Sequence, residues 1–220
     1  MRVDWAFAVE ILPVLAEAAL LTLGVTAAGF AISIALGLLL ALMRRSRRRA
    51  IAVPTAASIE AIRGTPLLIQ LYFIFFVLPE YGIVLPALAT GIVALGIHYA
   101  TYISEVFRAG IDAVPKGQWQ AAGALGLTPM QAFRHVIAPQ AVAAILPALG
   151  NYLIAMFKDT PLLSAIAVVE LMQRAKIIGS ESFRYLEPIT IVGLFFLAMS
   201  LGAATLVRAL ERRVRMPSAD

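Results

Sequence analysis

The sequence predicts an all-α integral membrane protein with five transmembrane helices, and three observations support this prediction. Of its residues, 61% are hydrophobic and only 14% are charged, whereas a soluble domain is about half apolar and about a quarter charged. The apolar residues form blocks that are long enough to cross the hydrocarbon core of a bilayer, for which a helix needs about 20 residues. The basic residues lie mostly on one side of the membrane when these blocks are taken as spans.

The predicted spans belong to a single transmembrane domain, 1–220. They cover about residues 18–43, 53–78, 82–106, 136–158 and 188–208. The second span is apolar apart from Glu60 and Arg63, and the other four each contain a long stretch without charge. Acidic residues at positions 4, 10 and 17 precede the first span, where a cleaved signal peptide carries positive charge. We therefore expect the first span to be retained.

The charge distribution predicts an outer N-terminus and a cytoplasmic C-terminus. With that orientation twelve basic residues lie inside and four outside, which agrees with the positive-inside rule. The inner ones are Arg44, Arg45, Arg47, Arg48, Arg49, Arg108, Lys116, Arg134, Arg208, Arg212, Arg213 and Arg215, and the outer ones are Arg2, Arg174, Lys176 and Arg184. The basic clusters are thus expected to anchor the topology and not to bind nucleic acid. The chain has no cysteine, which excludes disulfides and thiolate metal sites.

The longest inner loop, residues 109–139, carries an ordered pattern. Residues 118–125 favour a helix, and Gly126 stands where a helix end takes a left-handed residue. Thr128, Pro129 and Gln131 then match the N-cap, first and third positions of a capping box. Pro139 closes or kinks this second helix. The sequence predicts a hairpin of two short helices joined at a glycine turn.

Two interpretations of the hairpin follow from its composition. An amphipathic hairpin on the lipid surface carries a basic polar face, but only Lys116 and Arg134 are firmly basic here. Apolar side chains expected to be exposed are Trp119, Leu127, Met130 and Phe133. These side chains also suit a groove on a partner protein, because helix-in-groove docking is a recurrent recognition mode.

The hairpin resembles the E-A-A loop of ABC-importer permeases, in which E-A-A, three residues, G, nine residues and I-x-L-P follow one another. Here the pattern reads Gln120-Ala121-Ala122, Gly126, Val136 and Ala138-Pro139, with Gln120 in place of the acidic residue. The resemblance implies that loop 115–139 is the coupling helix that fits a cleft on a cytoplasmic ATPase. The residues it assigns to coupling are Gln120, Ala121, Ala122, Gly126, Leu127, Thr128, Pro129, Met130 and Phe133.

Three further segments are similar to the polar amino-acid uptake permeases of that superfamily: "IRGTPLLIQLYF" (62–73), "GNYLIAMFKDTPLLSAIAVVEL" (150–171) and "YLEPITIVG" (185–193). "FKDTPLLSAI" together with "IIGSESFRYLEPIT" (177–190) looks most like the ectoine/hydroxyectoine permeases. A polar amino acid, such as a basic or glutamine-type one, is the alternative solute.

The resemblance implies a type I ABC-importer permease fold in the bacterial cytoplasmic (inner) membrane. The implied partners are membrane lipid, a second permease subunit that is a similar chain or a second copy, two cytoplasmic ATPase subunits and an extracytoplasmic solute-binding protein. No cofactor is expected in this chain, because ATP and magnesium are used by the partner ATPase.

Two polar breaks in the spans are candidates for a solute path. Arg63 either pairs with Glu60 one turn away or faces a solute carboxylate, and Gly64-Thr65-Pro66 loosens the helix beside it. Lys158-Asp159-Thr160-Pro161 ends the fourth span, and broken helices with charged ends build solute sites in transporters. The candidate path residues are Arg63, Thr65, Gln70, Asn151, Lys158, Asp159, Thr160 and Glu170, with Glu105 as a lesser one.

Other features favour packing or exclude chemistry. The aromatic residues Tyr72, Phe73, Phe75 and Phe76 are predicted to pack and not to bind a cation, and His98 is predicted to be a core histidine. The sequence contains neither G-x-x-x-x-G-K-[ST] nor H-E-x-x-H, so ATP binding by this chain is not expected. An intramembrane enzyme or a channel subunit is the alternative from another class.

Overall fold

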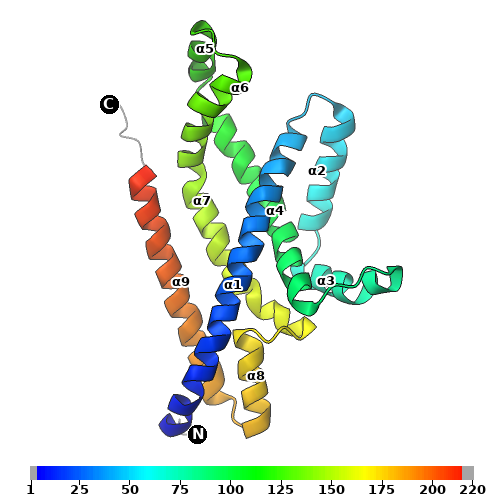
Figure 1. The fold of residues 1–220 in the computed structure, drawn as a ribbon, viewed down its shortest axis with the longest axis vertical. Helices are drawn as coiled ribbons and strands as arrows, with labels where there is room; N and C mark the ends of the chain where they lie inside the picture. The colour runs from blue at the N-terminus through cyan, green and yellow to red at the C-terminus, as the bar shows by residue number, and fades with distance from the viewer. Residues whose placement is uncertain (1–3, 215–220) are drawn as a thin grey trace.

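The computed structural model describes residues 4–214, so Arg2 and Arg215, which the topology prediction counts, lie outside the described residues. All regular secondary structure within 4–214 is helical. The chain runs back and forth along one long axis (Figure 1). Within these residues four helices are long and apolar enough to cross a membrane, and a bent pair makes a fifth if it is counted as one span. The predicted all-α architecture is confirmed.

The first helix, α1 (Trp5–Arg44), is 40 residues long and begins well before the predicted first span. Asp4 caps it, because its Oδ1 accepts hydrogen bonds from the backbone amides of Ala6 and Phe7 at 3.1 and 3.2 Å. The helix packs along α4 (Ala87–Ala113). A Cβ on Gly96 of α4 would lie 2.6 Å from Cγ2 of Ile32, so the two helices approach more closely than larger side chains would permit.

The second span is broken. It consists of α2 (Arg49–Arg63), α3 (Leu67–Tyr72), the π-helical turn η1 (Phe73–Val77) and the 3₁₀ turn η2 (Leu78–Tyr81). The segment 67–81 is bent by 103° from α2 and projects sideways from the bundle (Figure 1). The sequence predicts a weak point at Gly64-Thr65-Pro66, and the chain bends there, because proline has no amide to continue the helix.

The polar hairpin follows α4 at one end of the molecule (Figure 1). It contains α5 (Lys116–Ala124), α6 (Pro129–Ala132) and the π-helical turn η3 (Phe133–Ile137). Gly126 has a φ of 74°, and Thr128 and Gln131 form both bonds of the capping box. The predicted pair of short helices around a left-handed glycine is confirmed.

The rest of the chain returns to the opposite end and crosses once more. Helix α7 (Ala138–Asp159) carries Pro139 in its first turn and leads into the 3₁₀ segment η4 (Thr160–Ile166). Short α8 (Leu171–Ser182) lies at the end where α1 begins, and α9 (Leu186–Val214) runs from there back toward the hairpin end (Figure 1). Of the apolar helices, α9 is the least buried.

Two of the buried clusters hold the long helices together. The central one joins α1, α3, α4, α7 and η4 through side chains such as Leu71, Leu95, Met156 and Leu163. The second lies near the start of α1 and packs it against α8 and α9. Of the aromatic residues predicted to pack, Phe75 contacts the central cluster. Tyr72, Phe73 and Phe76 lie on the segment that projects from the bundle and are exposed within this chain. The Phe76 ring contacts those of Tyr72 and Phe75, with centroids 5.6 and 4.9 Å apart.

Candidate functional site

The hairpin presents apolar side chains at its tip and is anchored at its base. Leu125 and Met130 are 80% and 72% exposed, and Trp119 is also exposed. Leu125 is missing from the residues predicted from sequence, although it stands at the end of α5, directly before the glycine turn. Exposed apolar patches mark sites that contact a protein or a membrane, so the tip agrees with both interpretations of the hairpin.

The base of the hairpin is a small core. Ile111 and Val114 at the end of α4 pack with Ile137 and Ala141, and Phe133 packs against this group. Phe133 and Leu127, both predicted to be exposed, are half-buried, and Phe133 is so because it packs against this group. Within the E-A-A pattern, Ala122 is only 2% exposed. The remaining residues assigned to coupling, Gln120, Ala121, Gly126, Thr128 and Pro129, are exposed.

An ion network lies where α4 meets the hairpin. Arg44 pairs with Glu105, and Arg45 pairs with Asp112. Arg108 Nη2 lies 2.8 Å from Glu105 Oε2, and its Nη1 lies 3.5 Å from Asp112 Oδ2. The network ties the end of α1 to the end of α4. It also accounts for Glu105, which is engaged here and is not part of the polar cluster described next.

A second polar cluster joins the ends of α2 and α7 to α4. The hydroxyl of Tyr99 donates a hydrogen bond to Asp159 Oδ2 at 2.6 Å. The guanidinium carbon of Arg63 lies 4.9 Å from the ring centroid of Tyr102. The Tyr152 ring lies 6.3 Å from the Tyr99 ring and 5.9 Å from the Tyr102 ring, centroid to centroid. Three tyrosines thus connect a guanidinium with a carboxylate.

These tyrosines were not predicted from the sequence. Tyr99 and Tyr102 are three residues apart in α4 and therefore share one face of the helix. That spacing was an available signal, although one sequence does not show which face meets α7. Arg63 also lies 3.9 Å from Glu60, between Nη1 and Oε1, but Glu60 is mostly exposed. The pair with Glu60 is therefore present as a long contact, and the role of Arg63 toward a solute stays a prediction.

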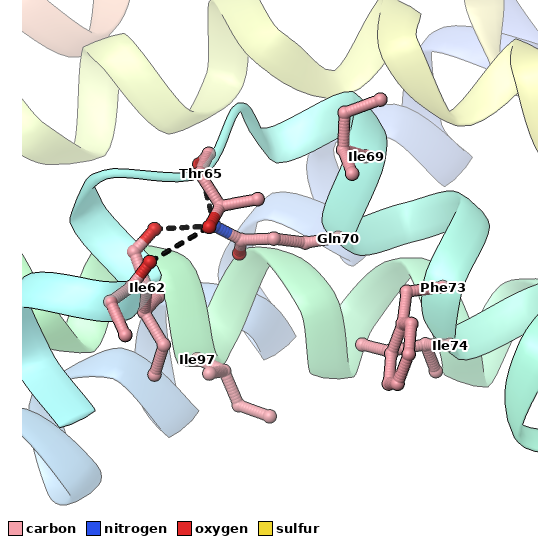
Figure 2. Close-up of a pocket in the computed structure, with 8 residues that line it drawn as sticks. Ile62, Thr65, Ile69, Gln70, Phe73, Ile74 and Ile97 are labelled. Atoms are coloured by element: carbon pink, nitrogen blue, oxygen red, sulfur yellow. Dashed lines mark hydrogen bonds between the residues drawn. The ribbon is translucent and has the colours of Figure 1, made fainter.

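The break in the second span borders an open cavity of about 390 Å³. Its lining is mostly apolar, with Thr65 and Gln70 as its polar members. Figure 2 shows Gln70 reaching from α3 back to the turn, where its Nε2 donates to the carbonyl oxygens of Ile62 and Thr65 at 2.7 and 2.8 Å. Its Oε1 lies 3.2 Å from Nδ1 of His98, which is buried as predicted.

The other candidate path residues lie elsewhere. Asn151 is exposed on α7. Lys158 is exposed and lines a separate cavity of about 340 Å³ between α7 and α9. Thr160 is buried and donates its hydroxyl hydrogen bond to the Phe157 carbonyl at 2.7 Å, which closes the end of α7.

Glu170 has a capping role. Its side chain is 0% exposed, and its carboxylate accepts hydrogen bonds from the backbone amides of Met172 and Gln173 at 2.9 and 2.8 Å. Burial raises the pKa of Glu170, although the two amide bonds act in the opposite direction. Glu170 therefore starts α8 and lies apart from the tyrosine cluster.

Comparisons with known proteins agree with this architecture. A family model described as "Binding-protein-dependent transport system inner membrane component" matches residues 33–216. A probable amino-acid ABC transporter permease, y4tG of Sinorhizobium fredii (strain NBRC 101917 / NGR234), is 48% identical over 208 residues, which are 94% of this chain and 90% of that protein. The L-cystine transport system permease TcyB of Bacillus subtilis (strain 168) is 35% identical over 92% of this chain and 88% of its own length. A chain in the crystal structure of an amino acid ABC transporter with histidines superposes with a TM-score of 0.90 at 40% identity, covering 97% of this chain and 100% of that one.

Proposed function

Because the chain belongs to the family of binding-protein-dependent transport system inner membrane components, we propose that it is the permease subunit of an ATP-driven importer of a small zwitterionic solute of the amino-acid class. The family places it as a multi-pass protein of the bacterial inner membrane. It is a transport subunit and not an enzyme, so the intramembrane enzyme considered from the sequence is excluded, and ATP is hydrolysed by partner ATPase subunits.

The observation that carries the coupling proposal is the hairpin tip. Leu125, Met130 and Trp119 are exposed on a preorganised pair of helices, and the hairpin is built directly onto α4 and α7. When an ATPase groove closes around the tip, its movement passes to both helices without a flexible link. Gln120 supplies a hydrogen-bonding amide in place of a carboxylate, so this contact forms without an ion pair at that position.

The proposed solute path runs along the tyrosine cluster. Arg63 suits the carboxylate of the solute, because guanidinium and carboxylate groups match in geometry. Asp159 and the faces of the tyrosine rings suit its cationic nitrogen. A carboxylate and a cationic centre are present both in ectoine or hydroxyectoine and in polar amino acids. Amino acids are favoured by the names of the relatives, whereas ectoine rests on the resemblance of two short segments.

In the proposed assembly this chain supplies one hairpin and one part of the solute path. A second permease, either a similar chain or a second copy of this one, completes the path, since closed two-fold assemblies are the commonest. Two ATPase subunits bind the two hairpins. A solute-binding protein docks at the opposite end, near α8. Capture of an ATPase with the purified chain separates this arrangement from a channel subunit.

One experiment tests the proposed function and its solute. The complete complex is reconstituted in vesicles and supplied with the binding protein loaded in turn with ectoine, hydroxyectoine, arginine, glutamine or cystine. We expect one class of loaded binding protein to raise ATP hydrolysis and to drive uptake of the same solute. An assembly in which no ligand changes the hydrolysis rate contradicts the proposal.

A further inference from the structure

The side-chain amide of Gln70 is fully engaged inside the protein. Its Nε2 donates to two backbone carbonyls (Figure 2). Its Oε1 lies within hydrogen-bonding distance of Nδ1 of His98. A glutamine side chain in that state has little left to offer a solute, although the residue lines a cavity. Its bonds instead connect three parts of the fold: the end of α2, the break itself and α4.

The two carbonyls that Gln70 binds lie at the break, where each lacks its i+4 helical amide, although the Ile62 carbonyl also accepts from the Thr65 amide at 3.2 Å. In a continuous helix the Ile62 carbonyl accepts from the residue four positions on, but that residue is Pro66, which has no amide hydrogen. The Thr65 carbonyl would accept from the amide of Ile69, and that amide binds the Pro66 carbonyl instead, at 3.0 Å. In a membrane an unsatisfied carbonyl is costly, so the amide of Gln70 stabilises this particular bend.

The same bonds reach the tyrosine cluster. The His98 ring lies 5.3 Å from the Tyr102 ring, centroid to centroid. Tyr102 in turn lies under the guanidinium of Arg63, which is the residue that follows Ile62. A shift of the Ile62 carbonyl therefore moves the backbone of Arg63. A shift of His98 moves the Tyr102 ring that lies under the Arg63 guanidinium.

We propose that Gln70 is a positioning residue, which fixes the bent second span on α4 and thereby holds Arg63 over Tyr102, and that it does not contact the solute. The part that concerns the bend is independent of the proposed function, and the part that concerns solute handling rests on it. Replacement of Gln70 should therefore change the geometry of the span as well as transport.

The test uses distance measurements on the complete chain. The sequence has no cysteine, so a pair of spin labels can be placed at Val53→Cys on α2 and Val77→Cys at the end of η1, both exposed positions. With Gln70 present we expect one narrow distance distribution. In Gln70→Leu the distribution should broaden or shift, and uptake by the reconstituted complex should fall at least about tenfold, because the Thr65 carbonyl loses the Gln70 donor and the Ile62 carbonyl keeps only the Thr65 amide.

Two further variants make the result specific. Gln173→Leu, on α8 and not on the broken span, is the matched control and should leave the distances and uptake unchanged. His98→Phe removes only the contact with α4 and keeps both carbonyl bonds, so it should broaden the distribution less than Gln70→Leu does. If Gln70→Leu does not fold, His98→Phe decides alone: an unchanged distribution overturns the proposal.

The outcomes also separate positioning from solute binding. Loss of uptake in Gln70→Leu with an unchanged distance distribution would make Gln70 a solute ligand and overturn the proposal. Unchanged uptake and distances would overturn it as well. If no solute drives uptake in the unsubstituted complex, the proposed function fails, while the label distances still decide whether Gln70 holds the bend.

Discussion

At the scale of single residues, Asp159 is an acidic group of the proposed path. It is half-buried at the end of α7 and accepts a hydrogen bond from Tyr99. Asp159→Asn keeps the size and the acceptor oxygen but removes the charge, so we expect solute uptake to fall about tenfold or more, since close charge pairs contribute more than about 1.4 kcal/mol when partly desolvated. Uptake by reconstituted vesicles measures this.

The control for Asp159 is another acidic residue. Glu80 is exposed in η2, away from the tyrosines, and Glu80→Gln should leave uptake unchanged. The amount of ATPase that copurifies should be the same in both variants, because neither residue lies near the hairpin. Full uptake by Asp159→Asn would assign the residue a structural role.

Glu170 gives a prediction about stability. Glu170→Ala removes the acceptor for the first amides of α8 and should destabilise the protein by about 1 kcal/mol, the usual cost of a lost N-cap. Glu170→Gln removes the buried charge and keeps one of the two acceptor oxygens, so it should destabilise the protein less than Glu170→Ala does near neutral pH. Thermal unfolding in detergent measures both variants, and equal destabilisation by Ala and Gln would contradict the capping role.

The same residue sets a pH dependence. Burial raises the pKa of Glu170 above its ordinary value of 4.5, so the folded state holds the proton more tightly than the unfolded state does. This contribution is fully present below the unfolded pKa and is lost as the pH rises through the folded pKa. The parent should therefore lose thermal stability relative to Glu170→Gln as the pH is raised from about 4 toward neutrality.

At the scale of elements, the hairpin depends on Gly126. Its φ of 74° is unfavourable for other residues, and a Cβ there would meet nothing within 4 Å, so the cost of substitution is conformational and not steric. Gly126→Pro requires a negative φ and should leave the spans folded but remove ATP-driven uptake. Vesicle uptake and ATPase copurification measure this.

Gly123 provides the matched control for the hairpin. It is exposed in α5, has room for a Cβ and lacks a positive φ. Gly123→Ala should therefore transport normally. Normal uptake by Gly126→Pro would contradict the coupling role of the turn.

The elements also show what a single sequence reveals. The hairpin could be predicted because Gly126, Thr128 and Pro129 act locally, through backbone conformation and capping. The site of the break at Pro66 could be predicted for the same reason, but its angle of 103° depends on contacts with α4. Long-range contacts such as Tyr99 with Asp159 have no local signature, so the tyrosine cluster was missed.

At the scale of the whole molecule, α1 and α4 form the central pair. Because a Cβ on Gly96 would lie 2.6 Å from Cγ2 and 2.9 Å from Cβ of Ile32, Gly96→Val should push the helices apart and cost about 1–3 kcal/mol or more, as overpacking does. Gly24→Val on α1 has nothing within 4 Å and is the control. The yield of monodisperse protein and its thermal stability measure both, and equal values would contradict close packing as the basis of the pair.

The orientation of the molecule remains a prediction from charge and can be tested with thiol labelling. Ser180→Cys on α8 and Gln118→Cys on α5 lie near opposite ends of the molecule and are both exposed. In intact cells an impermeant thiol reagent reaching the outer face of the inner membrane should label position 180 and spare position 118. The reverse pattern would invert the proposed topology.

The length of α1 has a consequence for how the protein sits in its bilayer. At about 1.5 Å per residue, its 40 residues make a helix about 60 Å long, whereas the hydrocarbon core of a bilayer is only about 30 Å thick. Transmembrane helices tilt by no more than about 40° from the bilayer normal, so tilting does not bury the whole of α1 in the hydrocarbon core. We therefore expect its ends to stand among the lipid headgroups and the water beyond. A change in the acyl-chain length of the lipids would then alter which turns of α1 contact the headgroups, without requiring the helix to bend.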